Sequence, residues 1–127
     1  MYEAIWVGAG GFIGAILRYV ISGYIQNLSQ SVSFPYGTLA VNVIGCVFIG
    51  TLSHLAEIKM GMTTEMRLLL MIGLLGSFTT FSTFGNETVN LLQDQGIFAA
   101  LINLGAHIFL GLLGVFLGRF LGILLWR

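Results

Sequence analysis

Long apolar runs separated by short polar segments make up most of this chain. Each run holds at least about the 20 residues that a helix needs to cross a bilayer. The connecting segments are short and turn-like, and little of the chain is left over for a soluble region. The pattern predicts an all-α integral membrane protein, a single membrane domain over residues 1–127 with four transmembrane helices at about 4–25, 37–56, 68–92 and 97–126.

The composition supports this class and removes others. Charged residues are 8% of the chain and apolar residues 57%, which does not suit a soluble domain. The net charge is zero and there is no basic run, so nothing indicates a nucleic-acid partner. The only cysteine, Cys46, excludes an internal disulfide and a cysteine metal site. The first run is too long for a signal peptide and follows Glu3 rather than a basic segment, so we expect it in the mature protein.

The few charges orient the chain only weakly. Lys59, Arg67 and Arg127 would share the side of the N-terminus, whereas Arg18 and Asp94 would lie toward the other side. The excess of positive charge favours a cytoplasmic N-terminus. The excess is so small that insertion in both orientations is compatible with the sequence.

A polar interruption stands inside the third apolar run. The segment GLLGSFTTFSTF, residues 73–84, contains two glycines, five hydroxyl residues and three phenylalanines. Every backbone N–H and C=O at membrane depth needs a partner, so such a segment fits a helix that breaks where it lines a protected cavity. The sequence predicts that the third helix is broken near Gly76–Thr79, beside an ion or solute site.

Small residues recur at a spacing of four on two of the predicted helices. Gly10 and Gly14 lie on the first, and Gly114, Gly118 and Gly122 lie on the fourth. This spacing lets helix backbones approach closely, within one chain or between two. Four helices are too few to enclose a wide pore, and two-fold symmetry is the commonest kind, so we expect a homodimer.

Polar and aromatic residues at membrane depth are the candidates for function. Thr38 and Asn42 are four apart on one helix face, and the Asn42 amide needs a ligand or a neighbouring helix as its partner. Phe81 and Phe84 are three apart, and the positive edges of their rings can attract an anion. Two phenylalanines in a membrane helix more often pack in the core or face lipid, so this role stays open.

Three further polar residues also leave two roles open. Glu87 is the only carboxylate well inside a run, and it marks an ion pathway or lies in a vestibule near Arg18 or Arg119. Asn103 and His107 are four apart in the last run. They form a second polar face that lines the same route, or else His107 is a packed, neutral histidine.

Three segments resemble the signatures of the Fluc (CrcB) fluoride channels: GGFIGAILRY at residues 10–19, GTLAVNVIG at 37–45 and GLLGSFTTFSTF at 73–84. The resemblance covers nearly the whole chain. It implies an antiparallel, dual-topology homodimer with two narrow fluoride pores, in the inner membrane of a prokaryotic cell. It also implies a fluoride-selective channel, not an enzyme, that exports cytoplasmic fluoride passively and relieves its toxicity.

The resemblance assigns roles to single residues. Asn42 resembles the pore asparagine whose amide donates to fluoride, and Phe81 and Phe84 resemble the phenylalanines whose ring edges line the route. Gly76 and Thr79 match positions whose backbone carbonyls, from both subunits, hold a structural sodium ion (Na+) on the dimer axis. Arg18 resembles the family's arginine at the end of the first span, which draws anions toward a vestibule. The less specific matches are Thr38, Thr83 and Glu87 at pore-side or vestibular positions.

Two departures from the family pattern stand out. Ser77 occupies a position where many relatives have a second glycine. In the fourth span many relatives offer hydroxyl groups along the pore, whereas Asn103 and His107 fill the matching places here. A histidine at a pore could bring pH dependence.

Two other functions fit four short spans. A small proton-coupled multidrug exporter needs a carboxylate in its binding chamber, usually in the first span, and Glu3 lies outside that span. Glu87 is the only substitute. A non-conducting assembly subunit is the third possibility, and fluoride efflux from proteoliposomes discriminates among the three.

Overall fold

The structure, a computed structural model, describes residues 1–58 and 61–126. All regular elements within these ranges are helices, as the sequence predicts. Four helical segments of these residues are long and apolar enough to cross a membrane. The fold is therefore that of a multi-pass membrane protein.

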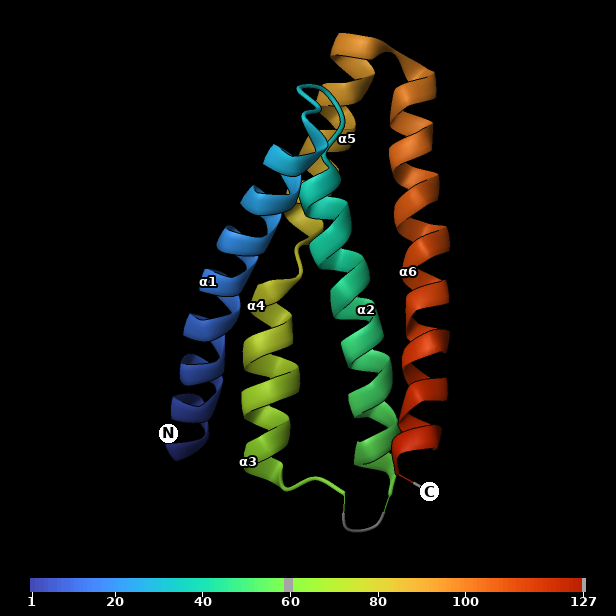
Figure 1. Ribbon diagram of the computed structural model, residues 1–127. Helices are drawn as coiled ribbons and strands as arrows, with labels where there is room; N and C mark the ends of the chain where they lie inside the picture. The colour runs from blue at the N-terminus through green and yellow to red at the C-terminus, as the bar shows by residue number, and fades with distance from the viewer. Residues whose placement is uncertain (59–60, 127) are drawn as a thin grey trace.

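Three of the four segments are single helices, and the third is assembled from shorter pieces (Figure 1). The single helices are α1 (Tyr2–Ser29), α2 (Tyr36–Glu57) and α6 (Ile97–Leu125). The third segment consists of α3 (Thr64–Arg67), the π-helix η1 (Leu68–Leu75), α4 (Gly76–Phe78) and α5 (Phe81–Gln95). The first and third segments extend beyond the predicted spans 4–25 and 68–92 at both ends.

Both termini lie at the same end of the molecule, as four antiparallel spans require (Figure 1). The end of α2 and the start of α3 are also at this end, and the connections between α1 and α2 and between α5 and α6 are at the other. Lys59 and Arg127, two of the charges used to orient the chain, lie outside the described residues.

Glycines set the contacts between the helices. At Gly10 and Gly14 of α1, a β-carbon would overlap the backbone carbonyls of Leu69 and Leu74. On α6, a β-carbon at Gly118 would overlap the carbonyl of Val47. The predicted small-residue spacing therefore serves packing within the chain, α1 against η1 and α2 against α6.

Turn residues connect the long helices tightly. Gln30 ends α1 in the left-handed conformation with φ 53°, and Gly96 joins α5 to α6 with φ 91°, a value that glycine adopts without strain. The Gln26 side chain fastens the first connection. Its Nε2 donates to the carbonyls of Ser31 and Phe34 at 2.7 and 3.1 Å, and its Oε1 accepts from Gly37 N at 3.0 Å.

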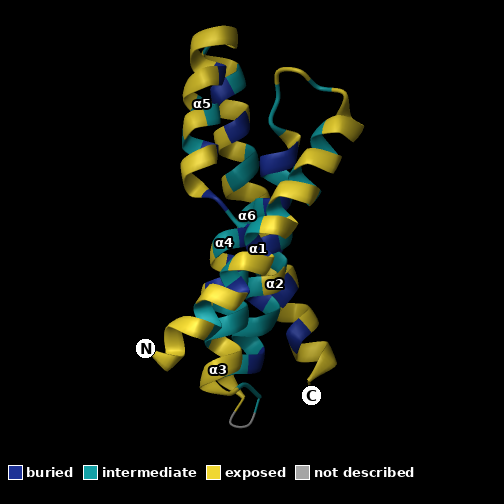
Figure 2. Ribbon diagram, turned by 90° about the vertical axis from the view of Figure 1, so that its left-hand side faces the viewer, coloured by how far each residue is buried: buried dark blue, intermediate teal, exposed yellow. Residues whose placement is uncertain are grey.

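Many large apolar residues are exposed, and exposed residues lie along all the long helices (Figure 2). The buried cluster is small and centres on Val41, Leu75 and Phe78, where α2 meets η1 and α4. A soluble monomer does not expose apolar surface on this scale, whereas lipid or another subunit can cover it. Phe78 of this cluster directly precedes the two residues that separate α4 from α5.

Candidate functional site

Thr79 and Thr80 have extended backbone between α4 and α5, with ψ angles of 158° and 114°. Thr79 N still donates to Leu75 O at 3.1 Å. Thr80 then caps the next helix, because its Oγ1 accepts from Thr83 N at 3.2 Å. The local sequence explains this geometry, since threonine favours a helix N-cap and extended backbone over a helix interior.

The Asn42 side chain binds the extended residues from α2. Thr80 N donates to Asn42 Oδ1 at 2.8 Å, and Asn42 Nδ2 donates to Thr80 O at 3.1 Å. The amide orientation follows from this pairing, because a backbone N–H can donate only to the oxygen. The Asn42 amide was expected to need a hydrogen-bond partner, and the Thr80 backbone is that partner. One of the two Nδ2 hydrogens is used for this contact, which leaves the second free to donate elsewhere.

This pairing also changes the surroundings of Gly76. In a continuous α-helix Thr80 N would donate to Gly76 O. Here Thr80 N donates to Asn42 instead, so the Gly76 carbonyl loses its usual donor. A β-carbon at Gly76 would meet only Met71 O, at 3.9 Å, so the surroundings of this residue are open.

Phe81 and Phe84 lie next to the extended residues with ring centroids 5.6 Å apart. Phe81 is 82% exposed and Phe84 only 9%. Both line an open, mostly apolar cavity of about 580 Å³ with Asn42, Thr79 and His107. The structure thus brings together the predicted amide, the two rings and the histidine, contributed by α2, α5 and α6.

The buried ring of Phe84 is held by a set of contacts between α5 and α6. Its centroid lies 4.3 Å from that of His107. His107 Nδ1 lies 3.0 Å from Asn103 O, and Asn103 Nδ2 donates to Thr88 Oγ1 at 2.8 Å. Thr88 Oγ1 in turn donates to Phe84 O at 2.8 Å. Asn103 is fully buried and does not line the cavity, so only His107 of this predicted polar face does.

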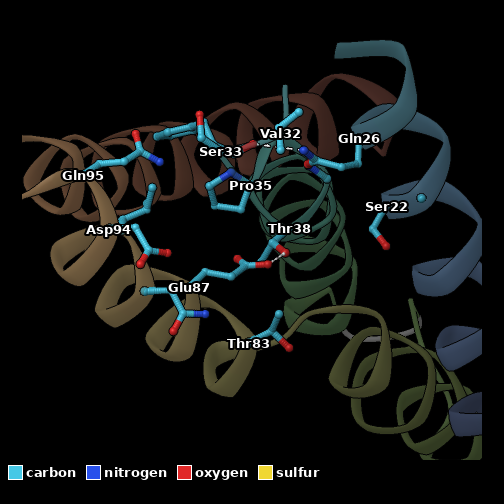
Figure 3. A pocket seen from close by; sticks show the side chains of 15 residues that line it. Ser22, Gln26, Val32, Ser33, Pro35, Thr38, Thr83, Glu87, Asp94 and Gln95 are labelled. Carbon is cyan, nitrogen blue, oxygen red and sulfur yellow. Dashed lines mark hydrogen bonds between the residues drawn. The ribbon is translucent and has the colours of Figure 1, made fainter. Parts of the chain in front are cut away.

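A second cavity, of about 990 Å³, opens at the end of the molecule away from the termini. Thr38 and Glu87 meet across it, where Thr38 Oγ1 donates to Glu87 Oε1 at 2.7 Å (Figure 3). The predicted residue Thr83 also lines this space, together with Asp94. Polar groups from α1, α2 and α5 therefore line this larger cavity, on the side of Asn42 away from the termini.

Of the two alternatives for Glu87, the one that places it near Arg18 or Arg119 is wrong about the arginine neighbour. The carboxylate of Glu87 pairs with Thr38, and Arg119 instead forms an ion pair with Glu57 at 3.0 Å. Arg18 is half-buried on α1 and lines neither of the two cavities. The helix rotations that decide these contacts are not visible in charge and spacing alone.

Sequence reasoning gave no hydrogen-bonding role to three hydroxyl side chains of the site. Thr80 was counted only among the hydroxyl residues of 73–84, although it stands where an N-cap follows a glycine-rich segment, and Thr88 was not singled out. Ser77 does more than replace a glycine, because its Oγ donates to Gly11 O at 2.9 Å and ties α4 to α1. No local signal points to Thr88, whose role depends on α6.

The fold and site define a class: a small multi-pass membrane protein whose polar groups gather around two extended residues inside one span. The model of the family described as CrcB-like protein, Camphor Resistance (CrcB), matches residues 5–119. The chain belongs to this family.

Relatives with nearly the same length support this assignment. The chain is 44% identical over 119 residues to a protein of Methanosarcina acetivorans named fluoride-specific ion channel FluC 1, covering 94% of this chain and 89% of the relative. It is 39% identical over 125 residues to the fluoride-specific ion channel FluC of Maridesulfovibrio salexigens, covering 98% of each. The corresponding protein of Dehalococcoides mccartyi is 42% identical over 125 residues, covering 98% of this chain and 95% of that relative.

Proposed function

We propose that this chain is a fluoride-selective ion channel that lets cytoplasmic fluoride leave the cell down its electrochemical gradient. The observation that carries this function is the 39–44% identity, over nearly the whole chain, to proteins named as fluoride-specific ion channels. The chain is accordingly a channel and not an enzyme. An inside-negative potential drives an anion outward with about 2.3 kcal/mol per 100 mV.

The chemistry of the smaller cavity suits this function. Fluoride is small and strongly hydrated, so conduction requires several weak partners that replace water without trapping the ion. The second Nδ2 hydrogen of Asn42 is one such donor, and the ring edges of Phe81 and Phe84 are others. None of these groups carries a full charge, and therefore none is expected to trap the ion.

The channel is completed by a second copy of the chain in antiparallel orientation. Phe81 is 82% exposed at the rim of an open cavity, so a single chain leaves this part of the route uncovered. Many other large apolar side chains are exposed as well, which provides surface for association. The weak charge bias of the sequence fits insertion in both orientations.

A structural sodium ion lies at the extended residues, held by the carbonyls of Gly76 and Thr79 from both copies. This proposal is supported by the Gly76 carbonyl, whose usual donor Thr80 N is bound to Asn42. We take the two extended residues as the functional break predicted near Gly76–Thr79. Oxygen ligands suit a hard cation. When bound, the ion supplies positive charge and a bridge between the two copies.

The larger cavity serves as the vestibule from which fluoride reaches the narrow part of the route. Thr38, Thr83 and Glu87 contribute its polar surface. Arg18 acts at a longer range, drawing anions toward the membrane surface rather than contacting them. The protein resides in the inner membrane of a prokaryotic cell, in keeping with the bacterial and archaeal relatives.

Fluoride efflux from proteoliposomes tests the function against the proton-coupled exporter. A channel gives fast, electrogenic efflux that does not require a proton gradient and that survives Glu87→Gln. An exporter that depends on Glu87 loses transport in this variant. A Phe81→Ala variant should lower efflux at least several-fold, whereas Phe116→Ala, which removes an exposed ring from α6, should conduct like the parent.

A further inference from the structure

Phe84 lies in a stretch of α5 that is held on both sides by an asparagine of another helix. Four residues before it, the backbone of Thr80 is bound to the side chain of Asn42 from α2. Four residues after it, Thr88 Oγ1 accepts from Asn103 Nδ2 of α6 at 2.8 Å. Four residues are about one helical turn. The turns that flank Phe84 are therefore fastened to two different helices.

The Asn103 side chain acts on Thr88 and not on the cavities. Thr88 Oγ1 has one hydrogen, which it donates to Phe84 O at 2.8 Å, so it can only accept from Asn103. Asn103 is 0% exposed and lines neither cavity. Its Oδ1 finds no hydrogen-bond partner within residues 1–58 and 61–126. The link to Thr88 is thus the contact through which this amide can influence the proposed route.

A buried amide is a poor way to stabilise the packing of α5 on α6. Burying a polar group costs free energy unless it is hydrogen-bonded, and Asn103 Oδ1 lacks a protein partner in the described residues. Apolar side chains of similar shape are often as stabilising as a buried hydrogen-bonded pair, or more so. A hydrogen bond instead adds direction, because it forms at one register of the two helices, whereas apolar side chains pack at neighbouring registers too.

The register of α5 on α6 decides where the ring of Phe84 lies. This ring packs with its centroid 4.3 Å from that of His107 on α6. His107 Nδ1 lies 3.0 Å from the backbone carbonyl of Asn103, so the ring and the link to Thr88 share one turn of α6. Phe84 also lines the smaller cavity with Asn42. A shift of α5 along α6 would move Phe84 relative to both.

We propose that Asn103 is a positioning residue of the channel: through Thr88 it holds α5 in the register that seats the Phe84 ring in the fluoride route, without contacting the ion. This inference rests on the proposed channel function. Asn103→Leu is similar in size and keeps the backbone contact with His107, but it removes the link. Fluoride efflux should fall about three- to tenfold, the change in the population of the seated ring that the loss of one hydrogen bond between membrane helices produces.

Stability separates positioning from a merely structural role. Asn103→Leu should unfold in mixed detergent at the same denaturant concentration as the parent or at a higher one, although its efflux is lower. Thr51→Val is the opposite control. It removes the hydrogen bond from Thr51 Oγ1 to Gly118 O, between α2 and α6, and should lose stability while it keeps parental efflux.

Variants of Thr88 test the link from its other end. Thr88→Val removes the hydroxyl group and should lower efflux as Asn103→Leu does, whereas Thr88→Ser keeps the hydroxyl group and should recover most of the loss. The double variant Asn103→Leu with Thr88→Val should conduct no worse than the weaker single variant, because both substitutions remove the same contact.

Fluorine NMR reports the position of the ring independently of conduction. With Phe84 replaced by 4-fluorophenylalanine, we expect one resonance in the otherwise parental chain. A second or broadened resonance should appear when Asn103→Leu or Thr88→Val is added. Thr51→Val should leave the spectrum unchanged.

Several outcomes would overturn the inference. Parental efflux in Asn103→Leu would do so, as would a loss of stability in step with its loss of efflux, because Asn103 would then be merely structural. A parent without efflux refutes the proposed channel, and the fluorine spectra then decide alone whether Asn103 positions the ring. If Asn103→Leu does not fold, efflux and spectra of Thr88→Val and Thr88→Ser decide: identical results for these two variants would refute the role of the hydroxyl link.

Discussion

The contact between Asn42 and the Thr80 backbone should stabilise the whole chain, and Asn42→Ala removes both of its hydrogen bonds. Hydrogen bonds between membrane helices contribute about 0.6 kcal/mol each on average, so their loss alone lowers the free energy of unfolding by about 1.2 kcal/mol. The substitution also strands the Thr80 N–H and C=O, and each buried group left without a partner costs about 1–3 kcal/mol. In the variant Thr80 N can donate to Gly76 O instead, and this new hydrogen bond recovers part of the lost stability. We expect a net loss of about 2–4 kcal/mol.

The assay is reversible unfolding of the purified protein in mixed detergent, followed by helical circular dichroism, with hydrogen exchange at Thr80 as a local readout. Thr51→Val is the matched control. Thr51 also lies on α2, and its Oγ1 donates to Val47 O and Gly118 O at 3.0 Å, far from the extended residues. The control should lose about 0.6 kcal/mol and keep parental fluoride efflux. If Asn42→Ala is no less stable than Thr51→Val, Asn42 does not support the extended residues.

Three further substitutions test the packing. Gln26→Met removes three hydrogen bonds from the first connection and should lower the free energy of unfolding by about 1–3 kcal/mol, measured by thermal unfolding. Gln93→Met, at an exposed position, should change it almost not at all. Equal melting temperatures of the two variants would contradict the role of Gln26. Ser77→Ala cuts the link to Gly11 and should lower the free energy of unfolding by about 0.6 kcal/mol, measured in the same assay; a gain in stability would show that the link is strained. Gly118→Leu forces a side chain into the backbone of α2 and should lower the free energy of unfolding by about 3 kcal/mol or more. Gly8→Leu places its side chain in open space and should keep the size-exclusion profile of the parent.

Apolar length was enough to predict the four spans, because a membrane helix satisfies its own backbone and needs only sufficient apolar residues. The short string from Gly73 to Phe84 also pointed to the region where Asn42, Phe81 and Phe84 meet. Glycine spacing also predicted where helices pack, because the close approach of two helices depends on residue size at fixed positions of each helix. These are local properties that one segment of sequence carries by itself.

The partners of the polar residues could not be predicted in this way. Asn42 and Thr80 are 38 residues apart, and their pairing depends on how α2 is rotated against α5. The same holds for Thr38 and Glu87, which are 49 residues apart, and it explains why the sequence offered Arg18 or Arg119 as an alternative neighbour of Glu87. The π-helical turns of η1 were not predicted from the sequence either.

The most direct test of the account is fluoride efflux from vesicles that contain only this purified chain, with the membrane potential set by potassium and valinomycin. The account predicts rapid efflux that accelerates when the vesicle interior is made negative and stops when valinomycin is omitted. Vesicles that keep their fluoride under an applied potential would contradict it.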